Sequence, residues 1–117
     1  MTNDPIHIDA PAASAFSIQR GADVALQLQF KDADGVVIDL TGHTWDSDFE
    51  TMDGTALADA FAIDSASQAT GRITLSVSRT VTADSSKMPD RFRHKLWSTS
   101  GGGLRRLWWY GTIQMRG

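Results

Sequence analysis

The groups in this sequence that could do acid–base or metal chemistry are three histidines and fourteen carboxylates, and their spacing favours neither. His7, His43 and His94 lie far apart and form no H-x-H or H-x-x-x-H pair of the kind that binds zinc. His94 falls on the apolar face of an alternating segment, which predicts a hydrogen-bonded core or interface histidine. Cysteine is absent, so thiolate metal sites and disulfides are excluded. We therefore expect no metal and no cofactor.

Two further motifs are explained better by chain geometry than by chemistry. In an EF-hand loop that starts at Asp32, glycine belongs at position 6 and glutamate at position 12. Here Gly35 is at position 4 and His43 is at position 12. The Gly101–Gly103 run lacks the following Lys-Ser/Thr of a phosphate-binding loop, and no G-x-S-x-G nucleophile motif occurs. The sequence predicts a protein that is not an enzyme.

Charge is distributed unevenly along the chain. The overall charge is −3, but the part up to Asp90 carries −9 and residues 91–117 carry +6. Such asymmetry indicates either a charged partner or basic strands that lie beside acidic neighbours in the same fold. The predicted contact surface combines basic and aromatic residues: Arg93, Lys95, Trp97, Arg105, Arg106 and Trp108. These residue types are typical of protein interfaces. Nucleic acid is a weaker alternative, because the net negative charge would repel phosphate.

These residues must be positioned by β-strands, because hydrophobic residues alternate with polar ones along most of the chain. Strands are predicted at 16–18, 24–31, 36–38, 44–52, 56–64, 71–78, 91–99 and 104–116. Alanines leave a helix open as the alternative at 56–64. A one-turn helix is predicted within 80–87, with Thr82 as its N-cap.

Turns and faces complete the prediction. Asp34-Gly35 and Asp53-Gly54 predict hairpin turns. In the last strand, one face is expected to hold Leu107, Trp109, Gly111, Ile113 and Met115. The other is expected to hold Trp108, Tyr110, Thr112, Gln114 and Arg116. Gly111 is expected to mark a bulge or bend.

The expected fold is all-β, a single-domain antiparallel β-sandwich of the immunoglobulin-like kind, with a small β-barrel as the alternative. Its domain is expected at residues 15–117, after a flexible arm at 1–14 in which Ile6–Ile8 could add an edge strand. The N-terminus lacks the basic and apolar regions of a signal peptide, and no apolar run is long enough to span a membrane. Synthesis and folding in the cytoplasm are expected.

The order of these segments resembles a group of small virion proteins of tailed bacteriophages. It is similar above all to the N-terminal module of upper baseplate proteins that attach the receptor-binding protein. The resemblance covers residues 16–116 and is most specific at Asp34-Gly35 and at Ile38-Asp39-Leu40-Thr41-Gly42. It implies that Thr41-Gly42 turns the chain between two sheets, that Asp39 caps this turn and that Leu40 fills the core. The family is acidic where this chain has Arg93-His94-Lys95, and larger baseplate proteins carry further domains.

The resemblance implies a non-enzymatic virion protein, made in the host cytoplasm, that binds other subunits of the tail or baseplate. Capsid decoration is the alternative place on the particle. Multiple copies or a homo-oligomer are expected, with no membrane partner. A carbohydrate- or host-surface-binding module is a further alternative, and it requires Trp97 and Trp108 to be exposed.

Overall fold

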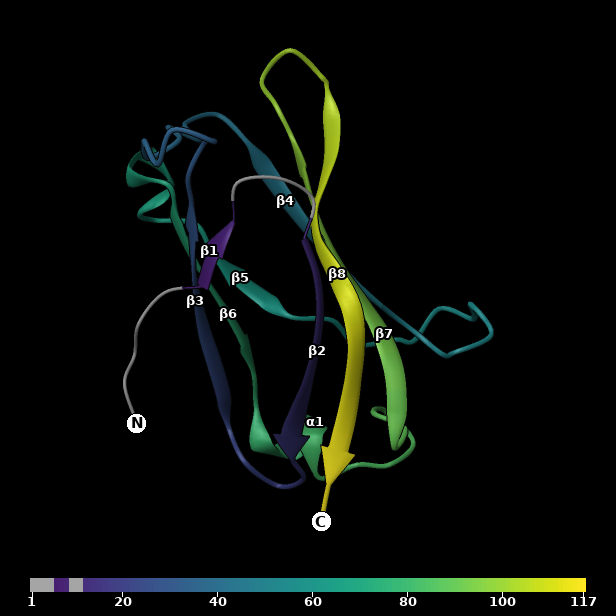
Figure 1. The fold of residues 1–117 in the computed structure, drawn as a ribbon. Coiled ribbons are helices and arrows are strands. Elements are labelled where there is room, and N and C mark those ends of the chain that lie inside the picture. Colours follow the sequence, from purple (N-terminus) through teal and green to yellow (C-terminus); the bar gives the residue numbers. More distant parts are fainter. Residues whose placement is uncertain (1–5, 9–11) are drawn as a thin grey trace.

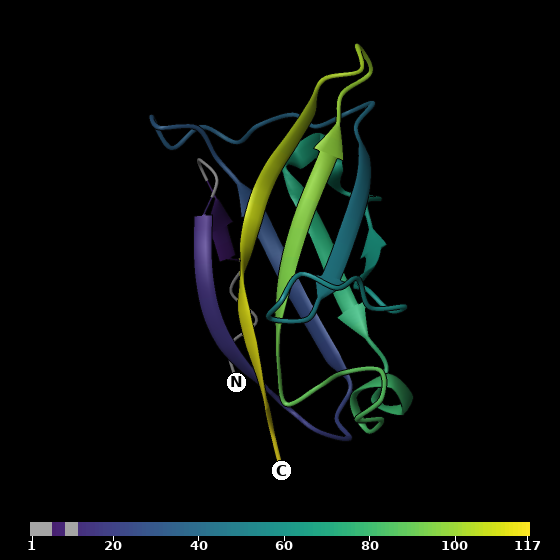
Figure 2. The same cartoon turned by 90° about the vertical axis from the view of Figure 1, so that its right-hand side faces the viewer.

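Two four-stranded sheets pack face to face in the computed structural model (Figure 1). The structure describes residues 6–8 and 12–117, and the side chains from residue 15 onward. The first sheet has the order β1 (Ile6–Ile8), β3 (Val24–Phe30), β6 (Arg72–Val77) and β5 (Ala62–Asp64). The second has the order β2 (Ala12–Gln19), β8 (Arg105–Arg116), β7 (Arg91–Thr99) and β4 (Thr44–Glu50), and Figure 2 views it face-on. The predicted all-β sandwich is confirmed.

Two of the strand pairings are parallel, although an antiparallel sandwich was predicted. β1 runs parallel to β3, and β2 runs parallel to β8 from Ala12↔Trp109 to Gln19↔Arg116. β2 ends where the turn at residues 20–23 leads into β3 of the opposite sheet, and β8 ends at the same end of the sandwich (Figure 1). The two strands therefore point in the same direction. Hairpin patterns report antiparallel neighbours and carry no information on such a pairing between the chain's two ends.

Of the two predicted return strands, 36–38 does not form a strand and 56–64 forms one only at its end. Val37 makes only an isolated bridge to Lys31, and Ala56 makes only an isolated bridge to Glu50. The Asp34-Gly35 and Asp53-Gly54 turns do form, but the chain then crosses between the sheets instead of continuing either hairpin. Ala62–Asp64 is the part of the predicted 56–64 strand that forms β5, and its partner is β6 in the first sheet. The partner of β3 is β6, which lies more than 40 residues away in sequence.

The short helix α1 (Arg79–Thr82) lies where a one-turn helix was predicted, but its capping residue differs. Ser78 is the N-cap, and Thr82, the predicted cap, is the last helical residue. Thr82 is fully buried, and its hydroxyl donates to the carbonyl of Ala22 at 2.8 Å. The polar residue therefore joins α1 to the β2–β3 turn. A second short helix, η1 (Gln68–Thr70), is a 3-10 turn that the sequence did not predict.

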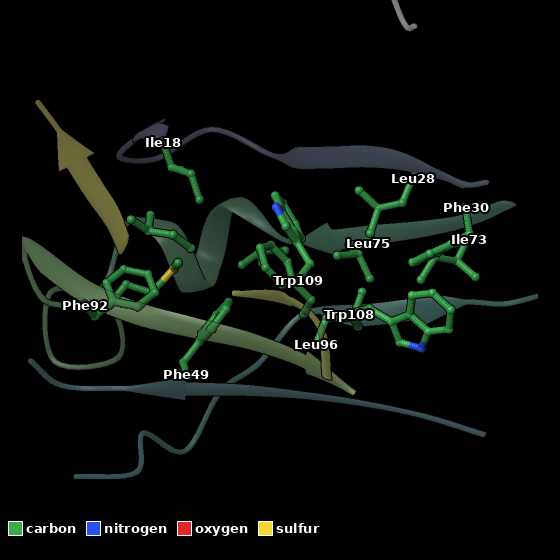
Figure 3. Packing of buried hydrophobic residues seen from close by; sticks show 14 of the residues in the cluster. Ile18, Leu28, Phe30, Phe49, Ile73, Leu75, Phe92, Leu96, Trp108 and Trp109 are labelled. Carbon is green, nitrogen blue, oxygen red and sulfur yellow. The ribbon is translucent and has the colours of Figure 1, made fainter. Parts of the chain in front are cut away.

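The core lies between the sheets and is rich in aromatic rings (Figure 3). Its fully buried members come from both sheets and include Leu28, Phe30, Phe49, Ile73, Leu75, Phe92, Leu96 and Ile113. Phe92, His94, Leu96 and Ser98 alternate inward along β7 as the period-two pattern predicts. Phe49 packs edge-on against Phe92 and Phe61, at ring-centroid distances of 5.1 and 4.9 Å. These geometries are favourable for aromatic pairs.

A β-bulge changes the predicted faces of β8. Leu96 pairs with Trp109, but Trp97 pairs with Leu107, so Trp108 is an extra residue in its strand. Both indoles consequently turn toward the core, and Trp108 and Trp109 are each only 2% exposed. The prediction that Trp108 lies on the outer face is wrong. The bulge lies at Trp108 and not at Gly111, where it was expected, because glycine is a common bulge residue but is not required for one.

The predicted arm at residues 1–14 is described only in part. Ile6–Ile8 forms the short edge strand that was considered possible, and β2 begins at Ala12, inside the predicted arm. Residues 1–5 and 9–11 lie outside the described part of the chain, so the flexibility of the arm stays a prediction.

Candidate functional site

The outer face of the second sheet carries charges of opposite sign on adjacent strands. β4 presents Asp46 and Asp48, while β7 presents Arg93 and Lys95. In the register of the two strands, Asp48 lies opposite Lys95, and the Lys95 ammonium is 3.2 Å from the Glu50 carboxylate. Acidic and basic segments that are distant in sequence are thus neighbours in the sheet. Two predicted contact residues, Arg93 and Lys95, therefore lie beside carboxylates of their own chain.

The β7–β8 hairpin projects past the rest of the sandwich at the end opposite the C-terminus (Figure 1). Its turn is closed by hydrogen bonds from the Ser100 amide to the Leu104 carbonyl and from the Gly103 amide to the Ser100 carbonyl, each 2.9 Å long. The Ser100 hydroxyl also accepts from the Leu104 amide at 3.1 Å. The tip is therefore a turn that three hydrogen bonds close. We call residues 97–107 the hairpin finger.

Leu104 is the residue of the hairpin finger that sequence reasoning missed. Its exposed fraction is 73%, the highest among the large hydrophobic residues that are exposed in the described part of the chain. The sequence placed Leu104 at the start of a strand and gave it no role in contacts. In the structure Leu104 precedes β8, and its position directly after the Gly101–Gly103 run was the signal in the sequence that could have placed it at the hairpin tip.

Two arginines next to Leu104 stack on tryptophan rings. The Arg105 guanidinium lies 4.0 Å from the centroid of the Trp97 ring, and the Arg106 guanidinium lies 3.8 Å from that of Trp108. Among the described residues, the ion pairs are Arg20–Asp90 and Lys95–Glu50, so no described carboxylate pairs with either arginine. Stacking holds each cation in place by a cation–π contact and leaves its charge uncompensated.

Trp108 supports the hairpin finger from inside the sandwich. Its indole N–H donates to the Ser98 hydroxyl at 2.7 Å, and the same hydroxyl lies 3.0 Å from Nδ1 of His43. The ring packs edge-on against Phe30 at a centroid distance of 5.0 Å. Trp108 therefore belongs to the core, and its assignment to the contact surface is corrected. Arg106, which covers this ring, remains exposed.

The predicted turn residues adopt the roles that the sequence and the resemblance assigned to them. Gly35 and Gly42 have φ values of 79° and 84°, which favour glycine. The Asp39 carboxylate accepts from the Thr41 amide at 2.9 Å and from its hydroxyl, and these hydrogen bonds lower the pKa of Asp39. Leu40 is 1% exposed. The segment joins β3 in one sheet to β4 in the other, with Asp34 in the preceding exposed turn. These residues shape the fold, and the carbonyl oxygen of Gly42 lies beside Gly101 of the hairpin finger, 3.9 Å from the position that a Cβ atom on Gly101 would take.

His94 is a core histidine, as predicted. It is 1% exposed and is surrounded by the rings of Trp109, Phe16 and Phe61, at centroid distances of 4.5, 5.5 and 6.2 Å. Burial among these rings lowers the pKa of His94 from 6.5 to about 4. The imidazole is thus neutral at physiological pH and is closed off from solvent, which fits packing and not catalysis.

The burial of His94 predicts a specific loss of stability in mild acid. In the unfolded chain His94 binds a proton below about pH 6.5, whereas in the folded chain it does so only below about pH 4. Above pH 6.5 His94 is neutral in both states, and the stability of the fold is highest. As the pH falls from 6.5 through 4, His94 is protonated in the unfolded chain but not in the folded one, so stability is lost. The pKa difference corresponds to about 3 kcal/mol. Urea unfolding at several pH values should show the loss.

The matched control is His94→Gln, which keeps a polar neutral side chain at the same position. The difference in unfolding free energy between the two proteins should shrink by about 3 kcal/mol between pH 7 and pH 4. A difference that stays constant over this range would show that His94 titrates normally in the folded protein.

Several hollows lie on the surface that the described residues form. One of about 730 Å³ is lined by Gln29, Val37, Ser67, Ala69, Thr70 and Arg72. The Arg72 guanidinium there donates to the Gln29 side-chain oxygen at 2.8 Å. Ser67 and Arg72 also line a smaller hollow, together with the Asp64 carboxylate. Within the described residues, no three His, Asp or Glu side chains gather in a way that could hold a metal ion. No helix in the described part of the chain has the length and apolarity needed to cross a membrane.

Comparisons with known proteins identify no family for this chain. No protein family matches the chain, and no curated protein matches it. Among solved structures, the Lin-41 filamin domain is similar, with a TM-score of 0.47 and 13% identity. The similarity covers 86% of this chain and 82% of that one. At this level it identifies neither an activity nor a partner.

Proposed function

We propose that this protein is a non-enzymatic structural subunit of a bacteriophage virion, associated with the tail or baseplate, that binds neighbouring virion proteins through its hairpin finger. The virion assignment is supported by the sequence resemblance described above. The choice of the hairpin finger is supported by one observation, the projection of exposed Leu104 beside two arginines that lack a described carboxylate partner. Capsid decoration is the second candidate location.

The chemistry of the hairpin finger indicates the kind of surface that it binds. An exposed leucine loses apolar contact with water when it enters a pocket, and arginine at an interface pairs with carboxylates in a fixed geometry. Because Arg105 and Arg106 are already positioned on indoles, they lose less conformational freedom on binding than unrestrained side chains would. The expected partner surface is an apolar pocket with carboxylates at its rim.

The two alternatives from the sequence have less support. A sugar-stacking site was expected to expose Trp97 and Trp108, but Trp108 is buried and the Trp97 ring is covered by Arg105. A nucleic-acid surface needs unpaired cations along a groove. Lys95 is paired with Glu50, and the acidic β4 strand runs beside β7. Binding to protein is therefore favoured.

The test is the presence of the protein in purified phage particles. Wild-type chain should copurify with particles, and Leu104→Asp should reduce its copies per particle at least tenfold, because loss of a buried anchor costs about 2 kcal/mol or more. Quantitative mass spectrometry of gradient-purified particles measures this ratio. Removal of both arginine charges, as in Arg105→Gln with Arg106→Gln, should also reduce incorporation.

Val36→Asp and Lys87→Gln are the matched controls, since both positions are exposed and lie outside the hairpin finger. Each should leave incorporation and the unfolding temperature unchanged. Absence of wild-type protein from particles would reject the virion role. Normal incorporation of Leu104→Asp would reject the hairpin finger as the contact but keep the virion role.

A further inference from the structure

The four sheet edges of this sandwich are protected to very different degrees. Exposed edges of natural proteins are usually short, charged, interrupted or covered, because a regular edge pairs with other strands. β1 and β5 are three residues long each. β4 carries Asp46, Asp48 and Glu50, and the segment that follows it crosses its free side, where the Leu57 amide donates to the Phe49 carbonyl at 2.8 Å.

Within the described part of the chain, β2 has none of these protections. It is eight residues long, with the sequence AASAFSIQ, and has no charged residue and no proline. It pairs in unbroken register with β8 over its whole length. It is the terminal strand of the second sheet, and no strand of the described residues pairs with its other side. In Figure 2 it forms the margin of that sheet beside β8.

The alternation of backbone groups along a strand identifies which residues of β2 direct their N–H and C=O groups toward its free side. The Arg20 amide, just after β2, donates to the Arg116 carbonyl of β8 at 2.7 Å. Backbone groups of residues two apart point the same way, so Ile18 and Phe16 also direct theirs toward β8. Ala15 and Ser17 therefore direct their amide and carbonyl groups toward the free edge. Both residues have exposed side chains that are too small to block a neighbouring strand.

The Phe16 ring would also benefit from a neighbouring strand. It stacks on Trp109, with a centroid distance of 5.5 Å and an angle of 3° between the rings, yet it is only half-buried. Because Phe16 belongs to an edge strand, side chains of a strand added beside β2 would cover the exposed part of its ring. Burial of this apolar surface adds to the main-chain hydrogen bonds that strand pairing forms.

We propose that β2 is the edge through which two copies of this protein pair, antiparallel and about a two-fold axis, to form one continuous eight-stranded sheet. The distribution of charge permits self-pairing at β2 and disfavours it at β4. Two-fold pairing places the same strand opposite itself, and for β2 this opposes no charges. The same pairing at β4 would set Asp46, Asp48 and Glu50 against one another, which is unfavourable. The proposal does not depend on the virion role or on the hairpin finger.

Analytical ultracentrifugation of the purified full chain tests this dimer. The wild type should dimerise with a dissociation constant below about 1 mM. Ala15→Lys should weaken dimerisation at least tenfold, because two-fold pairing brings the new charge close to that of the other copy. Ala62→Lys is the matched control, since Ala62 is an exposed alanine on the edge strand β5, and it should leave dimerisation unchanged.

Disulfide trapping locates the edge, because the chain contains no cysteine. Single Cys variants at Ala13, Ala15 and Ser17 sample β2, and the one nearest the two-fold axis should form a disulfide-linked dimer under mild oxidation. Ala62→Cys should not. A wild type that stays monomeric to millimolar concentration, a dimer that Ala15→Lys leaves intact, or trapping at Ala62 alone would each overturn the proposal.

Discussion

Replacing Gly71 by alanine should destabilise the protein by about 3 kcal/mol or more, one of the largest effects expected of any single substitution that adds only a methyl group. Gly71 lies between η1 and β6 with a φ of 72°, a region that costs an L-residue about 1 kcal/mol. A Cβ atom there would lie 2.8 Å from the carbonyl oxygens of Phe30 and Ile38. Both oxygens belong to backbone, so neither can move away without shifting its strand or loop.

The contacts around Gly71 show why this position cannot relax easily. Its carbonyl accepts from the Phe30 amide at 2.7 Å, and the Phe30 carbonyl accepts from the Ile38 amide at 3.0 Å. The segment after the Asp34-Gly35 turn thus lies directly over Gly71. Chemical denaturation of Gly71→Ala measures the loss as a change in unfolding free energy.

Gly35→Ala is the matched control for Gly71→Ala. Gly35 has a similar φ of 79°, but nothing lies within 4 Å of a Cβ added there. This variant should lose only the cost of backbone strain, about 1 kcal/mol. Equal losses in the two variants would show that the crowding at Gly71 relaxes and contributes nothing.

Trp108→Ala should cost about 3–5 kcal/mol, the range for removal of a buried aromatic side chain. The predicted alternation of β8 placed this indole on the outer face, where its loss would cost far less. In the structure Trp108 fills the core beside Phe30 and Trp45 and donates to the Ser98 hydroxyl. Thermal and urea unfolding of the variant therefore test the position of the β-bulge directly.

Tyr110→Ala is the control for Trp108→Ala, and Trp108→Phe separates the packing of the Trp108 ring from its hydrogen bond to Ser98. Tyr110 is 38% exposed and lies two residues further along β8, so its loss should cost clearly less than that of Trp108. Trp108→Phe keeps most of the packing but leaves Ser98 without its indole donor, for an intermediate cost of about 1–3 kcal/mol. A Trp108→Ala cost no greater than that of Tyr110→Ala would place Trp108 on the surface after all.

The bulge also explains how the hairpin finger is built. A regular β8 would place Trp108 on the opposite face from Trp109, but the extra residue turns both indoles inward. Trp108 then supports Arg106 from below, while Trp97 on the outer face supports Arg105. The two arginines beside Leu104 are therefore positioned by rings on both faces of one hairpin. Loss of Trp108 should disturb this arrangement as well as the core.

Sequence alone determined the local elements of this protein. The strands at 24–30, 44–50, 72–77 and 91–99 follow from strict alternation, because each has one face in the core and one in solvent. The turns at Gly35, Gly42 and Gly54 follow from the need for positive φ. Asp39 and His94 were also assigned correctly, since their roles depend on neighbours in the chain or on the face of one strand.

Only the tertiary structure decided which strands pair and which side chains reach the surface. The parallel pairing of β2 with β8, the return strands that cross to the other sheet and the inward turn of Trp108 depend on contacts between residues far apart in the chain. The basic residues of β7 likewise face the acidic β4 only after folding. Alternation reports which face of a strand is apolar, but it contains no information about the neighbouring strand. The extra residue in β8 leaves Trp109, Ile113 and Met115 on the predicted inner face, whereas Leu107 pairs with Trp97 on the outer face, against the prediction.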